Sequence, residues 1–465
     1  MTNDRDQAQQ LFSEGIRLLQ KGNSAAALTC FEKVYEVSSD PGVLLYAGTA
    51  LHNLERYEEA IACYQAAIRI APHVGEAHNN LGNTLMALFR FDEAVKSFTQ
   101  AALMLPAAPE PLTARATALQ ALGFITEAES DCRKALIIAP DFAQAHWNLA
   151  LNMLLQGHYS EGWREYDWRW RKADFTSPHR HSNIPRWDGS PLNGRTILLH
   201  AEQGFGDAIQ FVRYAPLVVQ RGGSVILEAH PELVSLFQGI AGVQTIIPFG
   251  APVPKFCLQA PLLSLPQIFN TTLGNIPTKV PYLTTPIAYR EKWISLMLNQ
   301  PAALRIGLVW AGKSYPDPLR SCRLTDLANI ADKDSATFFS LQIGAGSEAC
   351  EKPPIGMRLV DLTHQIKDFA DTAALIDQLD LVISIDTAVA HLAGALGKPT
   401  LLLLPFAPDW RWLLKRSDSP WYPSMRLFRQ SQQPDWGPPI EELKTFLTNT
   451  WLQTKKTLET SPKVF

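Results

Sequence analysis

The sequence has few cysteines and no long apolar run. Its 465 residues are 46% hydrophobic and 19% charged, a balance typical of globular chains, and the length predicts two or three domains. No segment approaches the roughly 20 apolar residues of a membrane span, and the polar start MTNDRDQAQQ does not resemble a signal peptide. The six cysteines include no CxxC pair. We therefore expect neither a disulfide framework nor a zinc site, and a reducing, cytoplasmic location.

Several function classes lack their usual signals. The net charge of −3 offers no basic surface for nucleic acid. We expect no metal because there is no HExxH or Cys/His cluster. The chain also lacks the GxSxG of hydrolases and the GxGxxG of NAD-dependent enzymes. Residues 1–177 carry 15 basic and 21 acidic side chains, and the remainder carries 27 and 24. The sign of that difference suits an anionic ligand in the second part.

The first third of the sequence repeats with a period of 34 residues. Small, aromatic and proline positions keep register over three copies, as Gly48, Ala60, Tyr64, Ala67 and Pro72; Gly82, Ala94, Phe98, Ala101 and Pro106; and Ala116, Ala128, Cys132, Ala135 and Pro140. Small residues let two helices approach, the aromatic ring fills the gap, and proline ends the second helix. The pattern resembles the tetratricopeptide repeat. An earlier copy surrounds Gly15, and a decayed fifth copy starts at Ala143.

Residues 1–177 are therefore predicted to form a solenoid of four repeats and a decayed capping repeat. Such a solenoid must cover its last hydrophobic face. We expect packing against the following domain to do so; an aromatic ligand box is the alternative. The side chains concerned are Trp163, Tyr166, Trp168 and Trp170. Residues 178–195 are rich in Pro, Ser and Asn and are interpreted as a linker.

Short β-type runs then alternate with helical stretches, which favours parallel sheets. The runs start at residues 197, 224, 244 and 256, and then at 305, 338, 357, 381 and 399. We expect an α + α/β chain in which two doubly wound halves, 196–286 and 287–436, face a cleft. A C-terminal helix and tail, 437–465, is expected to pack across the halves.

The most informative segment is LVISIDTAVAHLAGALGKPTLLLLP, residues 381–405. A strand ends at Asp386, Thr387 is an N-cap candidate, and a helix follows to about Leu396. Free N–H groups of the first turn at Ala388 and Val389 would then face a diphosphate at the carboxyl end of the strand. The alternative is an ordinary βαβ packing unit. His391 shares the helix face of Thr387 and is either a buried structural residue or a ligand contact.

Two loops supply further candidates. In QGFGDAIQ, Gly204 and Gly206 let the backbone approach a ligand, and Asp207 starts the next helix. Asp207 is either a general base for an acceptor hydroxyl or a charge that the helix dipole favours. Three basic side chains follow the β-type run that starts at residue 305. We expect them either to pair with a diphosphate or to lie on a solvated loop. They are Lys313, Arg320 and Arg323.

These motifs match a known family. DTAVAHLAGALGKP closely resembles the donor-site signature of the ADP-heptose:lipopolysaccharide heptosyltransferases, and QGFGDAIQ resembles their acceptor loop, over about residues 195–435. The resemblance implies a GT-B fold of two Rossmann-like halves, an inverting mechanism and no cofactor or metal beyond a nucleotide-sugar co-substrate. Carried over by motif, Asp207 is the base, and Gln203, Gly204 and Gly206 form the acceptor loop. The implied donor-diphosphate residues are Asp386, Thr387, Ala388, Val389, His391, Lys313 and Arg320.

The whole chain is similar to bacterial repeat-containing glycosyltransferases and, in arrangement, to the protein O-GlcNAc transferases. In the latter, asparagines along the repeat groove grip a peptide backbone. Asn80 and Asn148 occupy that position here, whereas Tyr46 and Ala114 interrupt the series.

The resulting hypothesis is an inverting, metal-independent glycosyltransferase that moves a sugar from a nucleotide-sugar to an acceptor, possibly a protein, recruited by the repeats. The alternative is a repeat scaffold with a degenerate nucleotide-binding module. Three aromatic side chains are expected either to stack on a base or sugar or to pack in the core. They are Trp410, Trp412 and Tyr422.

Overall fold

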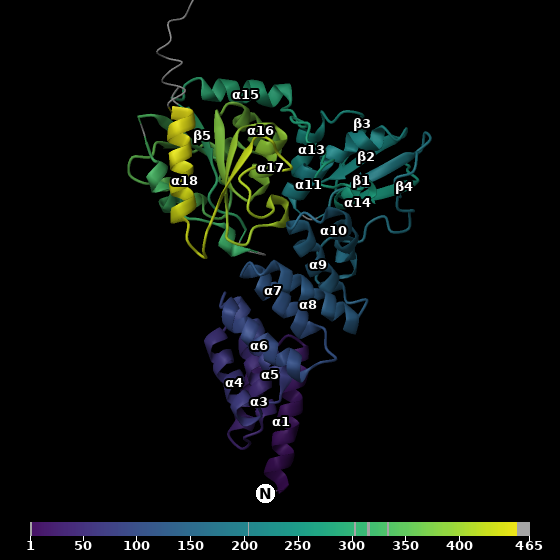
Figure 1. Cartoon of the computed structure of the whole chain (residues 1–465), viewed down its shortest axis with the longest axis vertical. Coiled ribbons are helices and arrows are strands. Elements are labelled where there is room, and N and C mark those ends of the chain that lie inside the picture. Colours follow the sequence, from purple (N-terminus) through teal and green to yellow (C-terminus); the bar gives the residue numbers. More distant parts are fainter. Residues whose placement is uncertain (1, 203, 302–303, 314–316, 333, 453–465) are drawn as a thin grey trace, which may run out of the picture. The chain divides into compact units, whose positions relative to one another are not determined.

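The structure, a computed structural model, describes residues 2–202, 204–301, 304–313, 317–332 and 334–452. The chain divides into two compact units (Figure 1). The first contains the residues up to 153 together with 165–173. The second contains residues 154–164 and the residues from 174 onwards.

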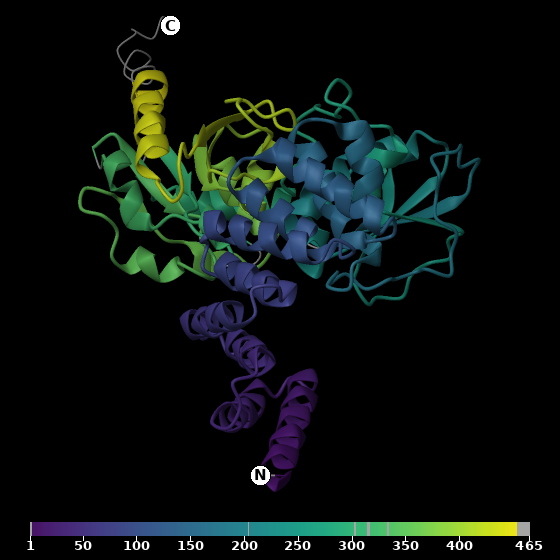
Figure 2. The same cartoon turned by 60° about the horizontal axis from the view of Figure 1, so that its bottom comes forward.

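The first unit is built from successive helix pairs, which Figure 2 shows stacked one after another. Each pair corresponds to one 34-residue repeat, and the last pair is the decayed copy that begins at Ala143. The helices are α1 (Thr2–Gln20), α2 (Ser24–Tyr35), α3 (Pro41–Asn53), α4 (Tyr57–Ile70), α5 (Gly75–Ala87), α6 (Phe91–Met104), α7 (Glu110–Ala121), α8 (Ile125–Ile138) and α9 (Ala143–Leu155). The second helix of the last pair is α10 (Tyr159–Tyr166), and most of its residues belong to the second unit.

Within each pair, the size of one small residue is matched to the ring that it contacts. A Cβ atom added to the glycine would lie far inside van der Waals distance of the ring, at 2.6 Å for Gly15–Phe31, 2.7 Å for Gly48–Tyr64 and 2.5 Å for Gly82–Phe98. In the next pair the ring is replaced by Cys132, and the facing position is Ala116. The methyl group is tolerated there because the thiol is much smaller than a ring.

The aromatic residues at the end of the repeats have two kinds of partner. Trp168 stacks on His146 of α9, with ring centroids 3.7 Å apart, and Tyr166 tilts against Trp147 at 4.8 Å. These contacts lie inside the first unit. Trp163 lies in the second unit, where it packs on Trp410 with centroids 5.2 Å apart. For Trp163, this agrees with the expected packing against the following domain.

The second unit begins with a parallel sheet in the order β3-β2-β1-β4. Its strands are β1 (Thr196–His200), β2 (Ser224–Ala229), β3 (Val243–Pro248) and β4 (Leu258–Pro261). The helices between and after them are α11 (Phe205–Phe211), α12 (Ala215–Val219), α13 (Pro231–Phe237), α14 (Leu265–Ile268) and α15 (Ile287–Met297).

The second parallel sheet has the order β10-β9-β8-β5-β6-β7. Its strands are β5 (Leu304–Leu308), β6 (Ala336–Ser340), β7 (Leu359–Val360), β8 (Leu381–Ile385), β9 (Thr400–Leu404) and β10 (Met425–Arg429). This is the doubly wound Rossmann order, in which the chain reverses direction between β5 and β8, so a ligand crevice is expected at their carboxyl ends. The two sheets confirm the predicted Rossmann-like halves. Strand β10 was not predicted.

The helices of the second sheet are α16 (Phe369–Asp377), α17 (Ala388–Ala395) and α18 (Gly437–Leu447). Helix α17 ends as expected, because Gly397 adopts a left-handed φ of 72°. Helix α18 contacts β9, β10 and the 3₁₀ segment η5 (Leu324–Ile330), all in the second half. The contacts described for it therefore do not support the expectation that it packs across the halves.

An aromatic cluster joins the start of α10 to both halves of the second unit. The Trp163 indole N–H donates to the Thr271 carbonyl of the first half at 3.1 Å. The Trp421 indole of the second half donates to the Tyr159 hydroxyl at 3.0 Å. Trp410, Trp412 and Tyr422 are all buried, so core packing, rather than stacking on a ligand, is the correct interpretation of these rings. Among the described residues, the helices are too short or too polar to cross a bilayer.

Candidate functional site

The two halves meet where α11 packs against α17. A Cβ atom added to Gly206 would lie 2.8 Å from Cδ2 of His391 and 3.5 Å from Cα of Ala388. Because Gly206 has no side chain, the first turn of α11 can lie directly on the first turn of α17. Gln203, the first residue of the expected acceptor loop, lies outside the described residues.

The first turn of α17 lacks a side-chain cap. Thr387 occupies the N-cap position, but its side chain makes no capping hydrogen bond and its Oγ1 lies 3.3 Å from Oγ of Ser384. Among the described residues, no N-cap side chain therefore accepts the N–H groups of Val389 and Ala390, and the N–H of Ala388 begins the helix ahead of them. The free N–H groups and the helix dipole together favour an anion at this position, which is the topological switch point of the sheet.

Asp386 lies between β8 and this turn, with its side chain 15% exposed. Burial raises the pKa of Asp386 to about 6, and the neighbouring Asp409 carboxylate contributes to the rise. The nearby Trp412 side chain and the positive charges of Arg411 and Arg320 oppose that rise. Asp386 is therefore a carboxyl group whose charge state changes near neutral pH.

His391 is a buried residue of α17 that packs against aromatic side chains. It is 5% exposed, its Nδ1 lies 2.8 Å from the Tyr422 hydroxyl, and its ring stacks on Trp412. Burial holds the pKa of His391 well below its usual range, so the imidazole is neutral. Its Nε2 lies 3.8 Å from Oδ1 of Asp386. The contacts fit the structural alternative for His391 better than a direct ligand contact.

Asp207 stands at the third position of α11, and both of its carboxylate oxygens are engaged. Oδ2 accepts the Gly204 backbone N–H at 3.2 Å, and Oδ1 accepts a hydrogen bond from Arg411. The side chain is 18% exposed. Burial raises the pKa of Asp207, and Arg411 and the Gly204 N–H oppose that rise. Asp207 thus caps its own helix, as the helix-charge alternative predicts, and also lies beside the α11–α17 contact, as a base would.

The three cations expected after β5 do not behave alike. The Arg320 guanidinium lies over Gly312, 3.0 Å from an added Cβ, and donates to the Lys313 carbonyl at 3.1 Å. The Lys313 side chain is exposed. Arg323 is 83% exposed and pairs with Asp326 at 2.7 Å. Of these side chains, Arg320 is the one whose charge acts on Asp386.

Arg411 is the functional candidate that the sequence analysis missed. It follows β9 in the segment DWRW, and its partners Asp207 and Gln210 are about 200 residues away in the other half. No local pattern signals a pairing at that separation.

The groove asparagines of the repeats are already bonded. Asn148 is 6% exposed, and its Nδ2 donates to the Thr113 carbonyl at 3.2 Å and to Oγ1 of Thr117 at 2.9 Å. Nδ2 of Asn80 lies 3.4 Å from Oγ1 of Thr49. Asn148 therefore ties one repeat to the next and has both amide hydrogens in use.

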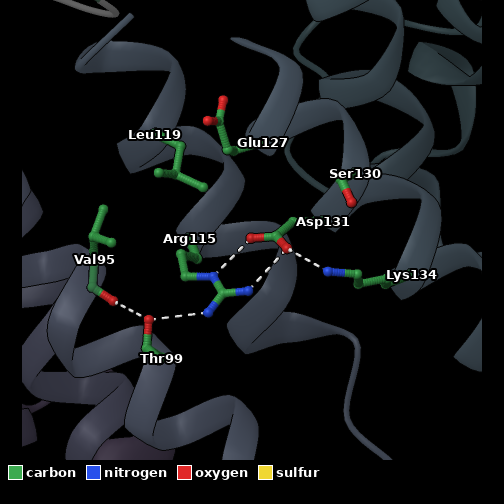
Figure 3. A pocket seen from close by; sticks show the side chains of 8 residues that line it. All are labelled: Val95, Thr99, Arg115, Leu119, Glu127, Ser130, Asp131 and Lys134. Atoms are coloured by element: carbon green, nitrogen blue, oxygen red, sulfur yellow. Dashed lines mark hydrogen bonds and ion pairs between the residues drawn. The ribbon is translucent and has the colours of Figure 1, made fainter. Parts of the chain in front are cut away.

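A pocket of about 290 Å³ lies among α6, α7 and α8 of the first unit (Figure 3). Three of its charged side chains, Arg115, Asp131 and Lys134, form ion pairs with one another. Arg115 forms a forked pair with Asp131 at 2.7 and 2.8 Å and donates to Oγ1 of Thr99 at 2.9 Å. We interpret this network as structural. Among the described residues, no group of three or more His, Cys, Asp or Glu side chains is arranged to hold a metal ion.

Comparison with known proteins found family-model matches in both units of the chain. Models described as TPR repeat and Tetratricopeptide repeat match residues 48–88 and 75–104. The model Glycosyltransferase family 9 (heptosyltransferase) matches residues 357–411, which span α16, β8, α17 and β9 and end at Arg411. The loop that contains Asp207 lies outside the matched residues.

Among relatives, the chain is 27% identical over 428 residues to Protein FlbA of Caulobacter vibrioides, covering 86% of this chain and 71% of that protein. Among solved structures, the chain matches MamA from Desulfovibrio magneticus RS-1 at 18% identity and a TM-score of 0.33, covering 35% of this chain and 92% of that one. A thermophilic TPR protein in Thermus thermophilus has 22% identity and a TM-score of 0.32, covering 36% and 91%. The chain thus contains a segment that matches tetratricopeptide-repeat models and, in its second unit, a segment that matches the glycosyltransferase family 9 model.

Proposed function

We propose that the chain is an inverting glycosyltransferase that needs no metal and uses a nucleotide-sugar donor. The observation that carries this proposal is the close approach of Gly206, the residue before Asp207, to the uncapped first turn of α17. A base and an anion site on opposite halves of one unit are what transfer of a sugar from a diphosphate requires.

In the proposed reaction, Asp207 takes the proton of an acceptor hydroxyl. The oxygen of that hydroxyl forms a bond to the anomeric carbon of the sugar. The bond from that carbon to the diphosphate oxygen breaks on the opposite face, and the electron pair leaves with the diphosphate. The N–H groups of Ala388 and Val389, with Thr387 and Asp386 beside them, would hold the leaving group. Arg320, and Lys313 from its exposed position, would neutralise its charge in place of a metal ion.

We further propose that the repeats recruit the acceptor and that it is a protein or peptide. The support is the matched repeat family, because stacked helix pairs present an extended binding surface. Asn80 is the better candidate for a groove contact, since Asn148 is buried and bonded within the repeats.

The test is nucleotide binding followed by turnover, both on the full chain. Thermal unfolding with UDP, GDP, ADP and CMP should show a raised midpoint for one of them. Screening the matching nucleotide-sugars for release of free nucleotide should then detect a turnover that Asp207→Asn lowers by roughly 10²–10⁴-fold.

Asp207→Asn should still bind the nucleotide, because the α17 turn is untouched. Asp141→Asn, at a side chain that is 91% exposed in the first unit, serves as the matched control and should behave as the unmodified chain. If no nucleotide raises the midpoint, the scaffold alternative replaces the enzyme. If Asp207→Asn turns over normally, Asp207 is not the base.

A further inference from the structure

We propose that Arg411 is the positioning residue of the site, which aims the Asp207 carboxylate across the junction between the two halves. This inference rests on the proposed function, in which Asp207 is the base. It assigns a role to a residue that neither the sequence motifs nor the resemblance identified.

Arg411 uses three of its nitrogens in three different directions. Nη2 donates to Oδ1 of Asp207, Nε donates to Oε1 of Gln210 at 2.6 Å, and Nη1 donates to Oδ1 of Asp409 at 2.9 Å. Asp207 and Gln210 lie one helical turn apart on α11, in the first half, whereas Asp409 belongs to the second half. The planar guanidinium therefore fixes the orientation of α11 relative to the second sheet.

The surroundings hold Arg411 rigidly in this place. The side chain is 9% exposed, and the guanidinium carbon lies 4.4 Å from the ring centre of Trp410. Trp410 is itself packed on Trp163. A charge this enclosed keeps its geometry, and its pairing with Asp207 is little screened by solvent.

The carboxylate of Asp207 is consequently held at both oxygens. Arg411 bonds Oδ1 and the Gly204 N–H bonds Oδ2. Each oxygen keeps a second lone pair, so one remains available for the proton of an acceptor hydroxyl. A base held in this way is oriented before the acceptor arrives.

The charges that face Asp207 come from several elements. Arg411 and Asp409 lie on the segment after β9, and Glu202 lies between β1 and α11. Asp386 and the neutral His391 lie next to each other at the α17 turn that Gly206 approaches. Asp409 and Glu202 disfavour the ionised carboxylate and Arg411 favours it. Arg411 thus opposes the rise in the pKa of Asp207 that burial causes, and so favours the ionised form that a base needs.

The test compares pH–rate profiles of the full chain for Arg411→Gln, Arg411→Lys and Arg290→Gln, with whichever nucleotide-sugar of the screen is turned over. Arg411→Gln should move the acid limb of the profile upward by roughly one pH unit or more, because an opposite charge is removed. Arg411→Lys should leave that limb near its original pH while lowering the maximal rate. A lysine keeps the positive charge but loses the planar guanidinium that donates to three acceptors. Arg290, about half exposed on α15, is the control and should change neither.

An acid limb that stays in place in Arg411→Gln would overturn the proposal, since a merely structural arginine lowers the rate at every pH alike. A second measurement, independent of turnover, is a double-mutant cycle of unfolding midpoints for Arg411→Gln and Asp207→Asn. Additive effects would refute the pairing itself. If the double-mutant cycle shows non-additive effects but no donor is turned over, the proposed function is refuted and the pairing of Arg411 with Asp207 is supported.

Discussion

Asp386 gives the second unit a recognisable pH dependence of stability. Its pKa in the folded chain is about 6, above the ordinary value of an aspartate, so the folded state binds more protons than the unfolded state between about pH 4 and 6. Stability from this group is therefore complete at low pH and is lost as the pH rises through about 6. Asparagine resembles the protonated carboxyl group and cannot ionise.

We accordingly predict that Asp386→Asn unfolds at a higher temperature than the unmodified chain at pH 7.5. The gap should be on the order of 2 kcal/mol and should close near pH 4. Calorimetric midpoints measured across this range test it, with Asp141→Asn as the exposed control. A gap that is constant with pH would show that Asp386 is not an uncompensated buried charge.

The residue scale also explains what sequence patterns predict poorly. Asp386 and Thr387 were predicted as site residues because they directly follow a strand, and Asp207 because it starts the helix after one; strand ends in parallel sheets lie at one edge. Arg411 was missed because its role depends on a contact with the other half of the unit. The hydrogen bonds of Asn148 within the repeats were equally unpredicted. A repeat position predicts where the asparagine lies, but not that Thr113 and Thr117 accept its amide hydrogens.

At the scale of helix pairs, each glycine is fitted to one ring. We predict that Gly82→Ala destabilises the first unit by about 1–2 kcal/mol, because the strain of overpacking against Phe98 exceeds the gain in helix propensity. Phe98→Cys alone should also destabilise, by leaving a cavity. Gly82→Ala/Phe98→Cys reproduces the natural pair Ala116–Cys132 and should cost less than the sum of its single changes. Urea unfolding measures all three, and strict additivity would contradict the size-matching argument.

The ion pair between α7 and α8 replaces apolar packing found elsewhere in the repeats. One period earlier, the positions of Arg115 and Asp131 hold Leu81 and Ser97, which are also buried. Arg115→Leu leaves the Asp131 carboxylate, 4% exposed, without its forked partner, so we predict a loss of about 3–5 kcal/mol.

The matched control is Arg115→Leu/Asp131→Ser, which copies the preceding repeat. Its stability should return to within about 1 kcal/mol of the unmodified chain or exceed it, because replacing a buried pair by apolar packing is often neutral or stabilising. Equal destabilisation of the single and double variants in urea unfolding would mean that the pair itself is not the source of the effect.

For elements, the sequence was most reliable where periodicity was strong. The 34-residue repeats and the apolar runs up to residue 399 all correspond to helix pairs and strands. Strand β10 was not predicted because its sequence MRLFR is short, contains two arginines and lies at the edge of its sheet. Its backbone partner β9 stabilises it, and that partner is not visible in the local pattern.

For the whole molecule, two compact units predict two unfolding events. We expect a calorimetric scan of the full chain to resolve two transitions and a nucleotide that binds to raise only the one that belongs to the second unit. A ligand at one hundred times its Kd adds about 2.7 kcal/mol. Arg115→Leu should lower only the other transition. A single transition that moves with both perturbations would mean that the units unfold as one.

Exchange of repeats between proteins of this kind is limited by where Tyr159 and Trp163 lie. They belong by sequence to the last helix pair, but their side chains fill space among Trp410, Trp421 and Phe211. A chimaera joined just after residue 177 would bring in foreign side chains at these two positions and leave a gap within the second unit. A recombination junction upstream of residue 154 keeps these rings with the part of the chain that they support.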